Sequence, residues 1–173
     1  MATTIEEVAA HESGHCVMAM AMGVKVKGIS AMSGSHPGSL LDSPDMTFAA
    51  ELVVETMYCL EARLTYLIAV GGFAGETILH GAIEPRGALD DLARLRGAGL
   101  TDFHIQGFTG IAIEVLNANI SVWNEIYAAA VQGIKTGNAL AVEGLAMHKL
   151  FNQTGKRFMD FYKLEDVLPL SYT

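Results

Sequence analysis

Two histidines four residues apart frame the segment His11-Glu12-Ser13-Gly14-His15. On a helix this spacing projects both side chains from one face about one turn apart, so both imidazoles can reach a single ion. Histidine nitrogens bind zinc at about 2.0–2.1 Å. Glu12 then lies beside the metal, where a carboxylate can take a proton from an activated water. The segment therefore predicts zinc ligands at His11 and His15 and a general base at Glu12.

A catalytic zinc site usually has a third protein ligand. One extended form of the motif supplies it from the same segment, with a glycine at position 18 and a histidine at position 21. This chain has Met18 and Ala21 instead, so the third ligand must come from further along. The residues alone leave four acidic candidates open, and the other histidines are interpreted as surface or core residues. The acidic candidates are Glu51, Glu55, Asp90 and Asp91, and the other histidines are His36, His80, His104 and His148.

The motif falls in a segment with helical spacing of apolar residues, which predicts a helix from Thr3 to Met22. Thr3 or Thr4 can cap its start and Gly23 can end it. In the following run, Val24–Ser30, valines alternate with lysines, which predicts a strand with one buried face. Further helices are predicted at 48–79 (as two helices or one bent helix), at 88–96, at 111–134 with an irregularity near 117–119, at 138–151 and at 155–168. A short strand is predicted at 39–41, and loop or broken helix at 97–110.

The composition is that of a globular protein, with 51% apolar and 17% charged residues. A net charge of -8 argues against a nucleic-acid binder, because a phosphate backbone attracts basic surfaces. We expect no membrane segment, since the most apolar window, Leu64–Ala74, is shorter than the about 20 residues that span a bilayer. We expect no signal peptide, because the first residues have neither a basic region nor an apolar core. Cys16 and Cys59 lie in apolar stretches, which indicates buried thiols and a cytoplasmic protein.

Three blocks of the sequence occur in the same order as in the peptidase domain of the FtsH family of zinc metalloproteases, which the chain resembles. The first block is the histidine motif with the strand after it. The second, Ile68–Glu76, reads I-A-V-G-G-F-A-G-E and is similar to the family's G-G-R-A-A-E-E segment. The third, Gly87–Leu92, reads G-A-L-D-D-L and is similar to the family's G-A-x-N-D-L segment. Together the blocks cover about residues 5 to 95.

The resemblance implies a ligand set, because the aspartate of the family's third block binds the zinc. It implies Asp91 as the third ligand beside His11 and His15, with Glu12 as general base. Glu76 matches the first glutamate of the middle block and is expected to accept a hydrogen bond from a ligating histidine, which fixes its tautomer. The implied fold class is mainly α with a small β-sheet (α+β), in which a zincin-like helix lies within a helical bundle. Residues 1–173 are expected to form a single domain of this type.

The chain also departs from the family. Phe73 replaces its arginine, and Thr77 replaces its second glutamate. The family joins this domain to a membrane anchor and an ATP-driven unfoldase, but this chain has no G-x-x-x-x-G-K-[ST] motif. We therefore expect a stand-alone peptidase that takes peptides, or unfolded proteins delivered by a separate ATPase.

The long apolar helices from Ile111 onward are compatible with a homo-oligomer. The alternatives are a catalytically inactive zinc-binding partner or regulatory protein, and a helical interaction protein whose motif is fortuitous.

Overall fold

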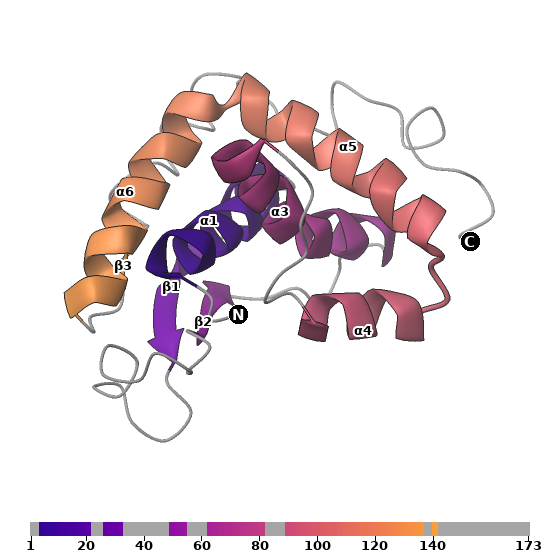
Figure 1. Cartoon of the computed structure of the whole chain (residues 1–173), viewed down its shortest axis with the longest axis horizontal. Helices are drawn as coiled ribbons and strands as arrows, with labels where there is room; N and C mark the ends of the chain where they lie inside the picture. Colours follow the sequence, from indigo (N-terminus) through magenta and orange to yellow (C-terminus); the bar gives the residue numbers. More distant parts are fainter. Residues whose placement is uncertain are drawn as a thin grey trace.

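A computed structural model describes residues 4–21, 26–32, 49–54, 62–81, 89–136 and 140–141 of the chain, and the side chains of 4–21, 66–81 and 91–136. This part is mainly helical, as the sequence predicts (Figure 1). Its elements, in chain order, are α1 (Ile5–Ala21), β1 (Val26–Met32), β2 (Ala49–Val54), α3 (Ala62–His80), α4 (Leu89–Gly97), α5 (Asp102–Ala118), α6 (Ile120–Thr136) and β3 (Leu140–Ala141).

Helix α1 is the central element. It contacts α3, α5, α6, β1 and β2, and every residue from Val8 to Ala21 is buried. Helices α5 and α6 arch around the pair formed by α1 and α3 (Figure 1). A helix that is apolar on all sides belongs in a core. Because α1 has no exposed face beyond its first turn, its ionisable side chains must find partners inside the protein.

The start of α1 is held by a capping box. The backbone N–H of Glu7 donates to Oγ1 of Thr4, and the backbone N–H of Thr4 donates to Oε2 of Glu7, both at 3.1 Å. This reciprocal pair satisfies two amide groups that the first turn leaves without helical partners. Thr4 is thus the cap, one of the two residues that the sequence predicted for this role.

Helix α3 packs against α1 in an antiparallel direction and at very short range. A Cβ atom added to Gly14 would collide with the carbonyl of Gly71, and one added to Gly75 would collide with the carbonyl of Ala10. Only glycine permits such close contact between the two backbones. The close approach brings side chains of α1 within hydrogen-bonding distance of the backbone and side chains of α3.

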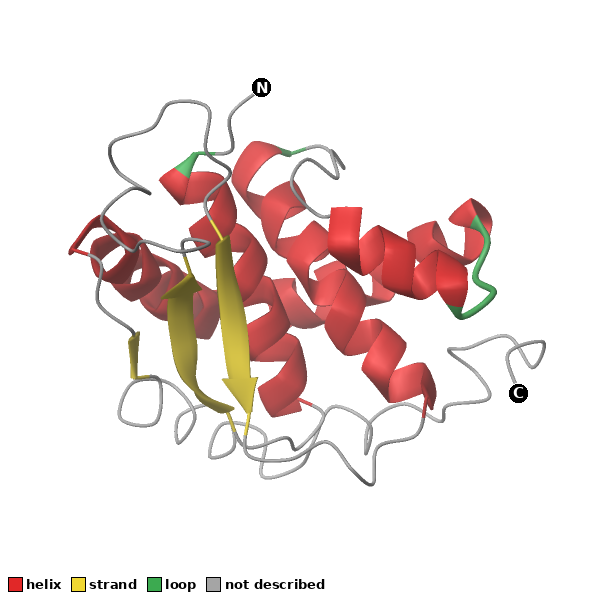
Figure 2. Cartoon of the chain, turned by 90° about the horizontal axis from the view of Figure 1, so that it is seen from below, coloured by secondary structure: helices red, strands yellow, loops and turns green. Residues whose placement is uncertain are grey.

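The strands form a three-stranded antiparallel sheet in the order β2-β1-β3 (Figure 2). Ile29 of β1 lies opposite Leu52 of β2 and Leu140 of β3. The strand predicted at 24–30 is β1, which begins and ends two residues later, at Val26 and Met32. The helix predicted from 48 begins only at Ala62, because residues 49–54 pair with β1 instead. Residues 140–141, predicted as helix, pair with the other side of β1.

The second half of the described chain differs in detail from its prediction. Helix α5 begins at Asp102, inside the segment predicted as loop or broken helix, and Thr101 caps it in a capping box with His104. The long helix predicted from 111 to 134 is divided at Asn119, within the irregularity predicted at 117–119. The side chain of Asn119 donates to the carbonyl of Val115. The described helices include none that is long and apolar enough to cross a membrane. The predicted strand at 39–41 and the predicted helix at 155–168 lie outside the described residues.

Candidate metal centre

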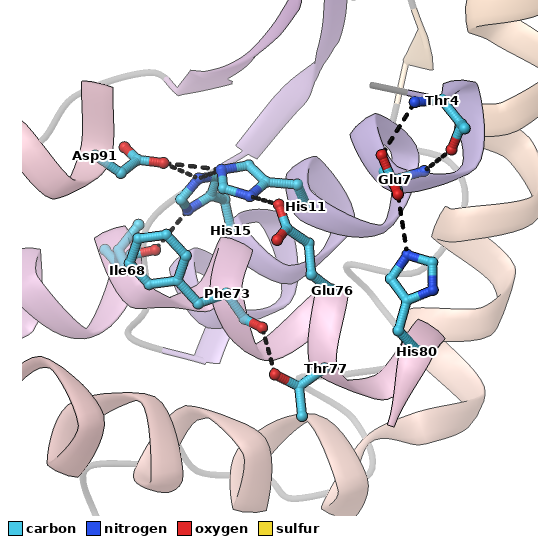
Figure 3. Close-up of polar contacts among 10 residues, drawn as sticks. All are labelled: Thr4, Glu7, His11, His15, Ile68, Phe73, Glu76, Thr77, His80 and Asp91. Carbon is cyan, nitrogen blue, oxygen red and sulfur yellow. Dashed lines mark hydrogen bonds and ion pairs between the residues drawn. The ribbon is translucent and has the colours of Figure 1, made fainter. Parts of the chain in front are cut away.

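Three electron-pair donors from α1 and α4 converge on one point. The Nε2 atoms of His11 and His15 are 2.9 Å apart. Oδ2 of Asp91, on the first turns of α4, lies 2.8 Å from Nε2 of His11 and 3.1 Å from Nε2 of His15 (Figure 3). The two helices thus bring together residues about 80 positions apart in the sequence.

The other nitrogen of each ring is already engaged by α3. Nδ1 of His15 donates to the carbonyl oxygen of Ile68 at 2.6 Å, and Nδ1 of His11 donates to Oε1 of Glu76 at 2.8 Å (Figure 3). A carbonyl oxygen only accepts hydrogen bonds, so Nδ1 of His15 must carry the proton. With the Glu76 carboxylate as acceptor, the same holds for His11. In the neutral rings both Nε2 atoms therefore present lone pairs to Asp91 and to each other.

Such a cluster requires a positive charge, because three electron-pair donors at this distance repel one another. Without a metal, a proton takes that place. Burial by itself lowers the pKa of His11, but hydrogen bonds with Asp91 and Glu76 outweigh it and raise the pKa to about 10. Burial raises the pKa of Asp91, but hydrogen bonds from both histidines outweigh it and hold the pKa well below its usual value. The arrangement thus favours a positive charge between these groups.

The donor set fits a zinc ion. Two histidine nitrogens and one carboxylate oxygen are a common combination in catalytic zinc sites, which keep a further position open. Tetrahedral bonds of about 2.0–2.1 Å separate ligand atoms by about 3.3–3.4 Å. The three atoms here are 2.8 to 3.1 Å apart, so each needs to move outward by only a few tenths of an ångström. Both Nδ1 protons are held by acceptors, as is usual for zinc-binding histidines.

Glu12 is the second carboxylate beside the histidines. One of its oxygens and one ring nitrogen each of His11 and His15 lie within 4.8 Å of one another. Asp91 is the better candidate for the third ligand, because one of its oxygens contacts both Nε2 atoms directly. Glu12, which is 7% exposed, is then the carboxylate that remains beside the two histidines, where a general base would have to lie.

One face of α3 positions both rings. Ile68, Gly72 and Glu76 recur at every fourth residue, which places them in one row along the helix. Ile68 holds His15, and Glu76 holds His11, as described above. Between them, Gly72 lies against the ring of His11, since a Cβ atom added there would collide with that ring. Phe73 stands where the FtsH pattern has an arginine. Its buried ring packs edge to face against the His11 ring, with the two ring centroids 6.1 Å apart.

The structure brings together the five residues of the predicted site: His11, Glu12, His15, Glu76 and Asp91. Two of the other histidines are elsewhere: His80 lies 3.4 Å from Glu7, and His104 caps α5. Sequence reasoning missed the carbonyl of Ile68, since a backbone acceptor leaves no trace in residue type. The other nominated residues are not placed here: Glu55, His36 and His148 lie outside the described residues, as do the side chains of Glu51 and Asp90.

Comparison with known proteins adds no further assignment. The sequence matches none of the models of known protein families against which it was scanned, and a search of curated proteins finds no similar sequence. The functional interpretation therefore depends on the geometry of the metal centre and on the motifs that form it.

Proposed function

We propose that this chain is a zinc-dependent metallopeptidase in which His11, His15 and Asp91 hold the metal and Glu12 is the general base. The observation that carries the proposal is the convergence of three electron-pair donors within 2.8 to 3.1 Å of one another. Both histidine Nδ1 atoms are occupied by acceptors on α3. That combination favours one divalent cation over an ordinary buried hydrogen-bond network.

The residues divide the work of peptide hydrolysis among them. A zinc ion bound here supplies an acidified water and a Lewis acid for the scissile carbonyl. Glu12 takes a proton from the attacking water and passes it to the leaving amine. Glu76 and the Ile68 carbonyl keep both Nε2 atoms aimed at one point, so no reorganisation of the rings is needed during the reaction.

The resemblance to the FtsH peptidase domain extends this proposal to fold and partners. In it, α1 is the zincin-like helix, placed beside the small sheet and within the helical bundle. The substrates are peptides or unfolded proteins, delivered where necessary by a separate ATPase, and the chain acts as a cytoplasmic homo-oligomer. The order of the three blocks supports this extension, and the buried free thiol of Cys16 agrees with a reducing compartment.

The test compares zinc content and cleavage in the parent and in Glu12→Gln. Elemental mass spectrometry should find about one zinc per chain in both proteins. Hydrolysis of a fluorescently labelled unfolded protein should occur only with the parent, since glutamine cannot accept the proton. Glu114→Gln, an exposed change on α5, should keep both properties. A parent that takes up no zinc when zinc is offered would refute the proposal.

A second candidate is a zinc-binding partner or regulatory protein without catalysis. The burial of the site favours it, because His11, Glu12 and His15 are only 7%, 7% and 8% exposed. Side chains this buried leave a substrate little access to the metal position. This candidate predicts one zinc per chain in the parent and no cleavage, with identical behaviour of Glu12→Gln.

A further inference from the structure

We infer that Gly72 is a positioning residue of the metal centre, because its lack of a side chain allows the His11 ring to use both nitrogens at once. The inference deepens the proposed function and rests on it for the zinc measurement. The contact between Gly72 and His11 belongs to the protein itself and can be tested without metal.

The contact involves one specific edge of the ring. A Cβ atom at position 72 would collide with Cε1, Nε2 and Nδ1 of His11, which form the N–C–N edge of the imidazole. Nδ1 on that edge lies 2.8 Å from Glu76, and Nε2 lies 2.8 Å from Asp91. A side chain at position 72 would therefore disturb the acceptor contact and the ligand contact together.

The required displacement is large on the scale of these contacts. An ordinary van der Waals contact to a Cβ atom is 3.4 Å or longer, so the ring must move by about 1 Å to accept a methyl group. Hydrogen bonds of 2.8 Å do not survive a displacement of that size. The ring must then either lose Glu76 or turn Nε2 away from Asp91.

The neighbouring glycine provides a matched control. A Cβ atom at Gly71 would lie 2.7 Å from the carbonyl oxygen of Gly14 and 2.8 Å from Cγ of Met18, and no histidine atom is among its nearest neighbours. Both glycines are buried in the middle of α3, so replacement by alanine changes helix propensity equally. The two variants therefore separate crowding of the helix interface from displacement of the ring.

The first measurement is zinc affinity of the full chain by competition with a chromophoric chelator. Gly72→Ala should weaken zinc binding about 10- to 100-fold, as loss of a group that orients a ligand does. Gly71→Ala should lower the melting temperature but keep the affinity of the parent within a few-fold. Equal losses of affinity in both variants would overturn the inference, because the glycines would then serve helix packing alone.

The second measurement is a double-mutant cycle on the metal-free protein. Gly72→Ala should lower the melting temperature of the parent, but not that of His11→Ala, in which the colliding ring is absent. Persistence of the loss in the His11→Ala background would overturn the inference. The double-mutant cycle also tests the inference when Gly72→Ala is too unstable for a zinc titration. Because it needs no zinc, it keeps a failure of this inference distinct from a failure of the proposed function.

Discussion

Nδ1 of His11 and Oε1 of Glu76, 2.8 Å apart, form the central contact of a polar seam between α1 and α3 (Figure 3). One turn towards the start of α1, Oε1 of Glu7 lies 3.4 Å from Nε2 of His80. From the Glu7–His80 contact to the His11–Glu76 contact, the step is four residues on both helices, which run antiparallel. The seam therefore ties the orientation of His11 to the register of the two helices.

Glu76→Gln should weaken zinc binding about tenfold, and Glu76→Ala up to about 100-fold. Glutamine can still accept the Nδ1 proton of His11 but lacks the negative charge that makes the ring a stronger ligand. Alanine leaves the Nδ1 proton without an acceptor. Chelator competition measures both affinities, and the exposed Glu114→Gln serves as the control. An unchanged affinity of Glu76→Ala would show that this carboxylate does not support the ligand.

Asp91→Ala should reduce zinc content to well below one per chain, because it removes the carboxylate that contacts both Nε2 atoms. Elemental mass spectrometry measures this directly. Asp102→Ala is the matched control, since that aspartate is 73% exposed and pairs with Arg96 at the surface. Full zinc occupancy in Asp91→Ala would move the third ligand to Glu12 or to a carboxylate outside the described residues.

The two histidines could be predicted from local geometry alone, since side chains four residues apart share a helix face. The third ligand could not be chosen from local geometry. The residues left Glu51, Glu55, Asp90 and Asp91 open, and only the resemblance to a family favoured Asp91. A residue 80 positions from His11 is brought to it by tertiary packing, which residue types do not reveal. The structure places Asp91 against both histidines, and its role as a ligand stays a prediction.

Strand β2 shows where the fold could not be predicted. Residues 49–54 contain alanine, glutamate and leucine, which favour helices, yet they pair with β1. That pairing depends on a partner strand more than 15 residues away. Helix α5 shows the opposite case, because Gly107 and Gly110 suggested a loop. There, burial of Phe108, Ala112 and neighbouring apolar residues outweighs the helix-breaking tendency of the glycines.

Gly107→Ala should raise the free energy of unfolding by about 0.5–1 kcal/mol. A Cβ atom added at this position meets nothing within 4 Å, so alanine brings its better helix propensity without a steric cost. Gly75→Ala should instead destabilise the protein, because the added Cβ atom would collide with the carbonyl of Ala10. Urea unfolding measures both changes. A destabilised Gly107→Ala would indicate that the exposed face of α5 is covered in solution.

The pH dependence of the metal-free protein should follow His11. Its pKa is about 10 in the folded protein and 6.5 in the unfolded chain, so folding favours the protonated ring. This stabilisation is fully present below pH 6.5 and is lost as the pH rises through about 10. The free energy of unfolding should therefore fall between about pH 6.5 and 8.5, a window that ends below the ordinary pKa of the Cys16 thiol, 9.0. Urea unfolding at several pH values measures the decrease, which His11→Ala should abolish.

Zinc affinity should depend on pH with the opposite sign, because the metal can bind His11 only after its proton has left. Displacement of one proton predicts that zinc affinity rises about tenfold for each pH unit across the same window. Chelator competition at pH values in that window measures the slope, with buffer and chelator titrations as references. A zinc affinity independent of pH in the parent would mean that the metal does not displace the proton held between His11 and Asp91. It would therefore place any bound zinc outside the site formed by His11, His15 and Asp91.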